Sequence, residues 1–394
     1  MVHISCRVDR IRTDGKRVVR RTRPNRYLLA VTDPGLIPLA LSYDDVLLVP
    51  RRSPVGSRRE PDTTSRFSRR ITLRAPVVSA NMDTVTESPM AAAMARAGGL
   101  GVIHRFLEVS QQTEEVAAVN QQTANEGETK GRGGGLAVAA AIGVQGDFLA
   151  RAAALADAGA DALVLDVAHG HAEHVLTALA AVRERIGDDV DIVAGNVATP
   201  EGVRDLAAAG ADAVKVGVGP GSACTTRVVT GVGVPQLSAV MWCAEALADH
   251  DVPLIADGGI RAGGDVAKAL AAGGDTVMVG NLLARADESP GEVVRHGGMR
   301  YRRYRGMASH GAAASRPAAN GSSPDAAEGV EGLVPVSGPV DATIRELVGG
   351  LRSSMSYCGA YDLIEFRRVA SFVRITAGGL KESHSHDILR GDRS

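Results

Sequence analysis

The sequence predicts an α/β fold, a (β/α)8 barrel, and three observations carry the prediction. Short apolar segments rich in β-branched residues recur eight times along the chain. Stretches rich in alanine and leucine lie between them, with apolar residues at steps of three and four, as in HAEHVLTALAAVRERIG. Strands that alternate with helices pair in parallel through right-handed crossovers, and eight such units close into a barrel. A doubly wound sheet is the alternative, but no GxGxxG turn with a later acidic residue follows the first strand.

The predicted strands follow one another from residue 75 to residue 282. The first three are APVVSA (75–80), GLGVIH (99–104) and LAVAAAIGV (136–144). The other five are DALVLDV (161–167), VDIVAGN (190–196), DAVKVGV (212–218), VPLIADG (252–258) and TVMVGNL (276–282). Each strand is followed by a segment with helical periodicity, as a barrel of this kind requires.

The composition excludes several classes of protein. Of the 394 residues, 45% are apolar and 3% aromatic, which suits a globular chain of one large domain or two ordinary ones. No run of about 18 apolar residues predicts a membrane span. With 44 Lys and Arg against 45 Asp and Glu, the formal charge of -1 gives no overall attraction to nucleic acid or to an anionic membrane.

The cysteines indicate where the protein works. Cys6, Cys224, Cys243 and Cys358 lie far apart in the chain, with no CxxC pair and no His/Cys cluster at the spacing of zinc ligands. We therefore expect a reducing, cytoplasmic setting rather than a disulfide framework or a zinc site.

Both ends of the chain lie outside the predicted barrel domain, residues 39–387. Residues 1–38 are an arginine-rich extension without the apolar stretch of a secretory signal. We interpret them as a solvated extension or the product of a misplaced start codon. A transit-type or nucleic-acid-binding arm is the alternative, although Asp9 and Asp14 interrupt the basic run. Residues 388–394 form a C-terminal tail.

The loops after the predicted strands hold most of the compact clusters of Gly, Asn, Ser and Asp. In such a barrel the active site lies on these loops, and phosphate commonly binds after the last two strands. Those two loops here are ADGGIRAGGD (256–265) and VGNLLA (279–284). Another loop, GVGPGSACTTR (217–227), places Cys224 among glycines and hydroxyl side chains, which makes it a candidate nucleophile. The pattern predicts a phosphorylated ligand.

Several motifs in these loops resemble one known family. The chain is similar to the IMP dehydrogenase/GMP reductase family, purine-nucleotide oxidoreductases built on a (β/α)8 barrel. The matching motifs are LSYDDVLLVP (41–50), SANMDTVTE (79–87), GPGSACTTR (219–227), GVGVPQ (231–236), IADGGIR (255–261), YRGM (304–307) and ESHSHD (382–387). The resemblance implies that Cys224, as a thiolate, attacks C2 of the purine to form a covalent thioimidate.

The resemblance also implies roles for other residues. We expect a purine nucleotide to contact Ser79, Met82 and Ser222 and to bind its ribose hydroxyls at Asp257. Gly259, Gly280, Asn281 and Tyr304 would surround the phosphate, although the family more often has a small residue at position 281. Gly306 and Met307 would lie beside the base, and Asp166 and Asn196 would line the nicotinamide cofactor site. A monovalent cation, potassium, would bind the carbonyls of Gly219, Gly221 and Cys224 together with Glu382 of a neighbouring subunit in a homotetramer.

The family runs two reactions on the same thioimidate. The dehydrogenase oxidises IMP with NAD and uses an Arg-Tyr pair on a mobile flap to hydrolyse the adduct, whereas the reductase converts GMP to IMP and ammonia with NADPH. The flap here, residues 308–333, is a loop sequence rich in Ala, Ser, Gly and Pro, and it has no Arg-Tyr pair. Thr226 and Glu328 match the reductase's proton-handling pair. These features favour the reductase.

Other features bear on the same choice. Residues 111–135 are too short for the regulatory module that most dehydrogenases carry between the second and third strands, which again favours the reductase. ESHSHD and DTVTE, in contrast, look more like a dehydrogenase, so IMP dehydrogenase stays the alternative. A GMP-like substrate such as a 7-deazapurine nucleotide, or a non-catalytic nucleotide-binding homologue, is also open. The joint presence of Cys224, Thr226 and Asp257 argues against a pure binding protein.

Overall fold

The computed structural model describes residues 37–315 and 326–385. The chain divides into two compact units, Met1–Leu39 and Ala40–Ser394, and all the elements named below belong to the second. Most of the predicted extension, the tail at residues 388–394 and the middle of the flap lie outside the described residues.

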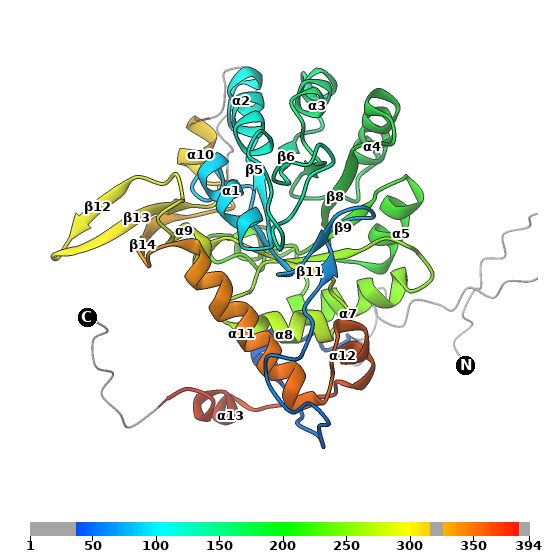
Figure 1. Cartoon of the computed structure of the whole chain (residues 1–394), viewed down its shortest axis with the longest axis vertical. Helices are drawn as coiled ribbons and strands as arrows, with labels where there is room; N and C mark the ends of the chain where they lie inside the picture. The colour runs from blue at the N-terminus through cyan, green and yellow to red at the C-terminus, as the bar shows by residue number, and fades with distance from the viewer. Residues whose placement is uncertain (1–36, 316–325, 386–394) are drawn as a thin grey trace, which may run out of the picture. The chain divides into compact units, whose positions relative to one another are not determined.

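Eight parallel strands form a closed barrel in the order β4-β5-β6-β7-β8-β9-β10-β11, which confirms the predicted fold (Figure 1). Every strand coincides with a segment predicted from the sequence, and β8 extends past its segment to Val197. Their bounds are β4 (Val77–Ser79), β5 (Leu100–Ile103), β6 (Ala139–Ile142), β7 (Ala162–Asp166), β8 (Asp191–Val197), β9 (Ala213–Val216), β10 (Leu254–Asp257) and β11 (Thr276–Val279). The barrel closes where Val279 of β11 pairs with Ser79 of β4.

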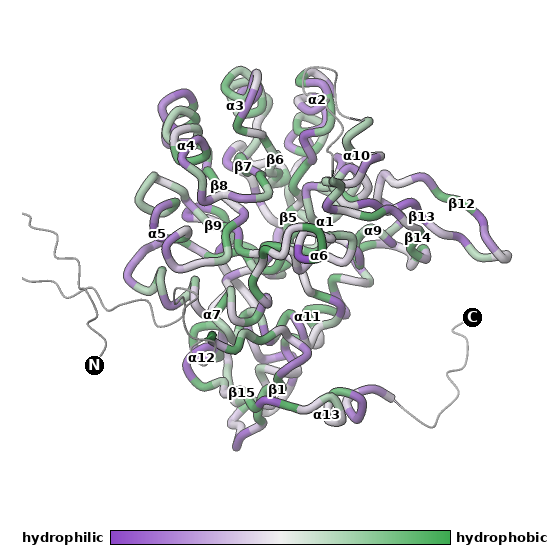
Figure 2. The backbone as a smooth tube through the Cα atoms, turned by 180° about the vertical axis from the view of Figure 1, so that it is seen from behind, coloured by the Kyte–Doolittle hydropathy of each residue, from purple (hydrophilic) through white to green (hydrophobic). Residues whose placement is uncertain are grey.

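Helices follow the strands and form the outer ring. They are α1 (Ser88–Arg96), α2 (Val109–Asn120), α3 (Phe148–Asp157), α4 (Glu173–Ile186), α5 (Pro200–Ala208), α6 (Thr226–Thr230), α7 (Gln236–Leu247), α8 (Gly263–Ala271), α9 (Asn281–Ala284), α11 (Val340–Cys358) and α12 (Leu363–Val369). Figure 2 shows hydrophobic and hydrophilic residues alternating along α2, α3 and α4, as expected for helices with one buried face. None of the helices in the described ranges has the length and apolar content needed to cross a membrane.

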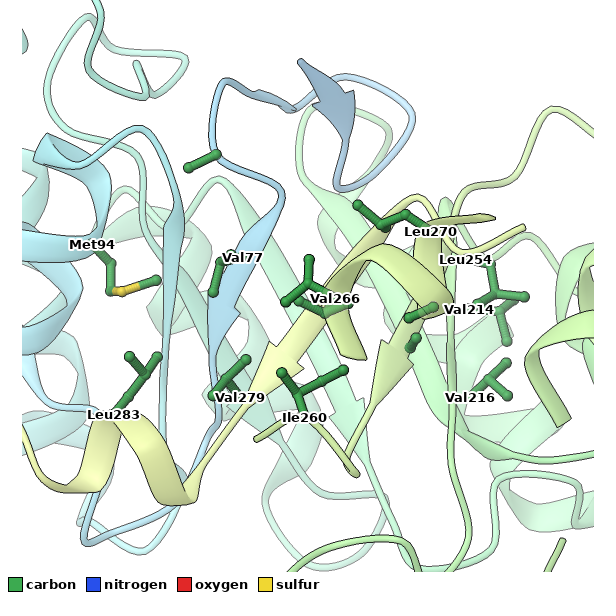
Figure 3. Close-up of a cluster of buried hydrophobic side chains, with 14 of the residues drawn as sticks. Val77, Met94, Val214, Val216, Leu254, Ile260, Val266, Leu270, Val279 and Leu283 are labelled. Carbon is green, nitrogen blue, oxygen red and sulfur yellow. The ribbon is translucent and has the colours of Figure 1, made fainter. Parts of the chain in front are cut away.

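The strands separate two layers of apolar side chains. Along β7, Ala162 and Val164 belong to the cluster inside the barrel, whereas Leu163 and Leu165 belong to the layer between strands and helices. This alternation is the two-residue period of a strand. Figure 3 shows part of the outer layer, where Val279 of β11 lies beside Leu283 of α9. Alanine is frequent in the inner cluster, as the narrow interior requires.

A repeated Gly-x-Asp sequence fixes the amino ends of three strands. In each repeat a glycine with positive φ ends the helix, and an aspartate two residues later accepts a hydrogen bond from the backbone N–H of a neighbouring strand. The three bonds join Asp161 to Val138 at 2.9 Å, Asp212 to Ile192 at 2.8 Å and Asp275 to Leu254 at 2.7 Å. The face opposite the active-site loops is therefore built for stability.

Smaller elements surround the barrel. The strand β1 (Val46–Leu48) pairs with β15 (Phe372–Arg374), and β2 (Ser65–Arg66) pairs with β3 (Thr72–Leu73). A three-stranded antiparallel sheet of β12 (Val293–His296), β13 (Met299–Arg305) and β14 (Glu331–Pro335) projects from the side of the barrel (Figure 1). The helix α13 (Ala377–Glu382) lies near the C-terminus, and a short 3-10 helix, η2 (Tyr43–Asp45), precedes β1.

The flap contains more regular structure than its sequence predicts. Within residues 308–333, interpreted from the sequence as a loop, the structure has helix α10 (His310–Ala314) and the first residues of β14. Ser309 caps this helix by accepting a hydrogen bond from the Ala312 N–H, and Ala312 and Ala313 are buried. A cap and two buried alanines suffice for one helical turn. Helical periodicity is recognised over longer segments, so the sequence does not predict this short helix.

Candidate active site

Two adjoining cavities open among the loops at the carboxyl ends of the strands. The first, which we call the cysteine cavity, has a volume of about 290 Å³ and is lined by Cys224, Thr226, Glu328 and the loops around them. The second, the glycine cavity, has a volume of about 510 Å³ and is lined by Gly258, Gly259 and Gly280. Residues common to both linings are Ala80, Met82, Gly221, Asp257, Met278 and Tyr304. Their shared wall makes them one continuous site at the place where barrels carry catalysis.

The cysteine loop is bonded to the return segment of the flap, by which we mean residues 328–330. Cys224 forms an antiparallel bridge with Gly329, and the Val330 N–H donates to the Ala223 carbonyl at 2.9 Å. Gly306 lies against the same carbonyl, since a Cβ there would come within 2.6 Å of it. Any side chain at position 306 would therefore separate the two segments.

A chain of hydrogen bonds begins at the cysteine. The Cys224 thiol donates to Oγ1 of Thr226 at 3.2 Å, and that hydroxyl donates to a carboxylate oxygen of Glu328 at 2.8 Å. The Thr225 N–H donates to the Glu328 carbonyl at 2.9 Å, which fixes the position of the glutamate. The groups of this relay line the cysteine cavity, so a proton can pass from the sulfur to a carboxylate beside a bound ligand.

A buried lysine holds the acidic groups at the floor of the site. Lys215 of β9 is 2% exposed, and its ammonium lies 3.1 Å from Asp166 and 2.8 Å from Asp257. The side-chain amide of Asn196 joins the cluster, accepting from Lys215 and donating to Asp257 at 2.9 Å. Burial by itself would raise the pKa of Asp166, but Lys215 and Arg105 outweigh it and hold that pKa below its ordinary value.

Hydroxyl groups gather where the two cavities meet. The Tyr304 hydroxyl lies 3.3 Å from Oγ of Ser222 and 3.9 Å from the Met82 sulfur. Burial raises the pKa of Tyr304, so its phenol stays protonated and able to donate. Gly280 packs against this hydroxyl, since a Cβ there would lie 3.2 Å from it. Neutral donors beside a glycine loop suit an anionic group that approaches the backbone closely.

The structure gathers most of the site residues predicted from the sequence around these cavities. The cysteine cavity is lined by Met82, Asp166, Asn196, Gly219, Gly221, Cys224, Thr226, Asp257, Tyr304, Gly306, Met307 and Glu328. The glycine cavity adds Ser222, Gly259, Gly280 and Asn281.

Two predicted residues lie elsewhere. Ser79 is fully buried at the end of β4, accepts a hydrogen bond from Thr86 at 2.8 Å and lines neither cavity. Glu382 ends α13, and this helix contributes to neither lining. Its expected role depends on a second subunit, so it stays a prediction.

Several lining residues received no role from the sequence, among them Lys215, Arg105 and Gln236. Lys215 sits inside the apolar run DAVKVGV, and a lysine in a buried strand is itself a signal, because it requires acidic partners. Arg105 follows β5, and its Nε is buried without a hydrogen-bond partner among the described residues. Gln236 donates to the carbonyls of Val216 and Asp257 at 2.9 and 3.1 Å. Gln236 ends the motif GVGVPQ, which could have pointed to it, whereas no spacing rule points to Arg105.

The residues fit a nicotinamide cofactor but not a metal held by side chains. Beside Cys224, the cysteine cavity offers an acceptor at Asp166 and a donor at Arg105, which suits a carboxamide. Within the part of the chain that the structure describes, no three His, Cys, Asp or Glu side chains come together as metal ligands. His171 instead lies 2.8 Å from Asp205.

Comparison with known proteins identifies the family. The model of the IMP dehydrogenase/GMP reductase domain matches residues 40–386. The chain is 38% identical to inosine-5'-monophosphate dehydrogenase of Nitrosopumilus maritimus, over 89% of this chain and 98% of that protein. It is 37% identical to GMP reductase of Leishmania donovani, over 90% and 98%. These alignments extend over 469 and 482 positions, so both relatives contain segments that the 394-residue chain lacks.

A solved structure gives the same result. A variant of GMP reductase from Trypanosoma brucei, in complex with guanosine 5'-monophosphate, superposes with a TM-score of 0.83 at 35% identity, covering 90% of this chain and 99% of that one. The fold, the cysteine loop and these matches agree with the motifs in the sequence. The chain therefore belongs to the IMP dehydrogenase/GMP reductase family, whose members are purine-nucleotide oxidoreductases.

Proposed function

We propose that this protein is a GMP reductase, which converts GMP or a GMP-like purine nucleotide to IMP and ammonia through a thioimidate on Cys224. The observation that carries the proposal is the hydrogen-bonded series Cys224–Thr226–Glu328. NADPH, when bound, supplies the hydride for C2 of the purine.

The direction of the hydrogen bonds indicates how the protons move. The thiol donates to Thr226, and Thr226 donates to Glu328, so the sulfur can become a thiolate as the carboxylate gains a proton. The thiolate adds to C2 of GMP, and the 2-amino group leaves as ammonia after taking up a proton from Glu328. Hydride addition at C2 and cleavage of the C–S bond then give IMP and return the thiolate.

Other residues bind and orient the ligands. Asp257, held by Lys215, accepts hydrogen bonds from the ribose hydroxyls, and the glycine cavity receives the phosphate at Gly259, Gly280, Asn281, Ser222 and Tyr304. Met82, Gly306 and Met307 lie around the base, and Asp166 and Asn196 face the nicotinamide. A potassium ion on the carbonyls of Gly219, Gly221 and Cys224, with Glu382 of a neighbouring subunit, is part of the proposal, as are a homotetramer and a cytoplasmic setting.

IMP dehydrogenase is the second candidate. Relatives with that name are as similar to the chain as those named GMP reductase, at 38% and 37% identity. Hydrolysis of an XMP adduct needs a base that activates water, and residues 308–333 contain no Arg-Tyr pair to do so. Their single arginine precedes a proline. The reductase needs no attacking water, which is why we favour it.

One spectrophotometric experiment separates the two reactions. Purified protein with potassium is mixed with GMP and NADPH, or with IMP and NAD, and absorbance is followed at about 340 nm, where the reduced nicotinamide absorbs. We expect a fall in the first mixture and no change in the second. Thr226→Val should abolish the fall, whereas Thr225→Val, whose side chain lies outside the relay, should retain it. A rise in the second mixture alone would establish the dehydrogenase instead.

A further inference from the structure

The glycine cavity contains an arginine to which no motif gives a role. Arg285 follows α9 and lines the cavity one helical turn after Asn281. Its Nη2 donates to the Asn281 side-chain oxygen at 2.7 Å, while its Nε is buried without a hydrogen-bond partner among the described residues. Arg285 itself is half-buried, and a buried N–H that makes no hydrogen bond is costly unless a ligand completes it.

The other charged groups of this cavity are already bonded within the protein. Asp44 and Arg261 form a two-point ion pair, and Asp257 is bound by Lys215. Arg227 donates to the carbonyls of Val218 and Val234, which fixes it behind the glycine loop.

Arg285 differs from all of them. No carboxylate in the described ranges lies within ion-pair distance of it, and its side chain donates instead to the neutral amide of Asn281. Arg227 likewise has no carboxylate partner in the described ranges, but its Nε is bonded, so Arg285 is the arginine of this lining whose guanidinium keeps a buried N–H without a partner there.

Further donors line the same cavity. Gly280, next to Asn281, packs against the Tyr304 hydroxyl, and that hydroxyl lies 3.3 Å from Ser222. The Tyr43 hydroxyl is also buried in this lining, without a partner among the described residues. With its oxygen bonded to Arg285, the Asn281 amide has its two N–H groups to offer. An unmatched cation and several neutral donors suit a phosphate.

We propose that Arg285, positioned by Asn281, binds the 5'-phosphate of the nucleotide and sets the preference of this protein for nucleotides over nucleosides. A guanidinium presents a planar fork that matches two phosphate oxygens, and such charge-assisted bonds are stronger than those from neutral donors. The inference rests on the proposed purine-nucleotide site, but not on which of the two reactions the site performs.

Calorimetric titration of the full chain tests this assignment. The ligands are GMP, IMP, guanosine and inosine, and the variants are Arg285→Gln and Arg285→Lys. Arg368→Gln is the matched control, because Arg368 is an exposed arginine of α12, 73% accessible, that pairs with Glu365. For Arg285→Gln we expect GMP and IMP to bind about 10- to 100-fold more weakly, the effect of losing one or two charged hydrogen bonds. The affinity for guanosine and inosine should not change. The nucleotide affinity of Arg285→Lys should lie between those of the wild type and Arg285→Gln.

The outcomes distinguish this inference from the proposed reaction. Equal losses for nucleotides and nucleosides, or unchanged nucleotide affinity, would overturn the role of Arg285 even if GMP reduction persists. Selective loss of nucleotide affinity supports it even if the protein proves to oxidise IMP. Thermal unfolding of each variant without ligand shows whether it is folded, and Arg285→Lys supplies the comparison if the glutamine variant is not.

Discussion

Removing the ammonium of Lys215 tests how the floor of the site is stabilised. The substitution Lys215→Met keeps most of the length and volume of the side chain but leaves Asp166 and Asp257 without their cation. The two contacts measure 3.1 and 2.8 Å, and each is worth about 5 kcal/mol of Coulomb attraction at an effective dielectric of about 20. Desolvation offsets most of this attraction, and breaking one partner out of a buried pair costs about 3–5 kcal/mol.

The loss of folding stability in Lys215→Met should be larger at neutral pH than in mild acid. In the wild type burial raises the pKa of Asp166, but Lys215 and Arg105 outweigh it and hold that pKa below its ordinary value. This carboxylate therefore stabilises the fold above its ordinary pKa, and the contribution is lost as pH falls. In Lys215→Met the effect of burial dominates and the pKa of Asp166 rises. The folded variant then takes up a proton that the unfolded chain does not, and its stability recovers as pH falls from about 7.5 toward about 5.

Urea unfolding, followed by the fluorescence of the single tryptophan Trp242, measures both effects. We expect a destabilisation of about 3–5 kcal/mol near neutral pH and a smaller one in mild acid. Lys130→Met is the control, because Lys130 is an exposed lysine. A loss below about 1 kcal/mol, or one that is the same at both pH values, would refute the view that the lysine compensates buried carboxylates.

Three further predictions concern single contacts. Glu328→Gln should lower kcat about 100- to 10,000-fold without weakening nucleotide binding. Steady-state kinetics measures kcat and calorimetry measures the nucleotide affinity. Parallel losses of kcat and affinity would contradict a proton-handling role. Gly101→Ala should lower stability by about 1–3 kcal/mol in urea unfolding, because the new Cβ would come within 2.4 Å of the Ala91 backbone. Gly280→Ala should raise KM for the nucleotide several-fold with little change in melting temperature, since its Cβ would press on the Tyr304 hydroxyl at 3.2 Å; an unchanged KM would place the phosphate elsewhere.

The barrel could be predicted from sequence because its strands are buried on both faces. The apolar stretches ALVL in DALVLDV and VPLIA in VPLIADG are uninterrupted, and the aspartates and glycine around them mark their ends. The projecting sheet of β12, β13 and β14 lacks that signal. Its strands read VVRH, MRYRRYR and EGLVP, and most of their residues are exposed or half-buried. The glycine pair at 297–298, both with positive φ, is the one hairpin signal that the sequence offers there.

The candidate site was predictable to the extent that its residues lie in motifs. Cys224, Thr226 and Asp257 stand in recognisable sequences, so their convergence follows from the barrel. Lys215 and Arg285 do not, because their importance depends on which groups face them in space. For Lys215 the partners come from β7 and β10, which lie near it in the barrel. For Arg285 the relevant fact is the lack of an acidic partner among the described residues, which the spacing of residues along the chain does not reveal.

The backbone bonds between the cysteine loop and the return segment of the flap suggest how one fold can serve two reactions. Cys224 pairs with Gly329, and the Thr225 N–H binds the Glu328 carbonyl, so backbone bonds from the return segment of the flap hold the glutamate beside Thr226. Among the described residues, the relay is therefore held together by the cysteine loop and residues 328–330. This fastening of Glu328, together with the lack of an Arg-Tyr pair in the flap sequence, is why we propose expulsion of ammonia rather than hydrolysis of the adduct.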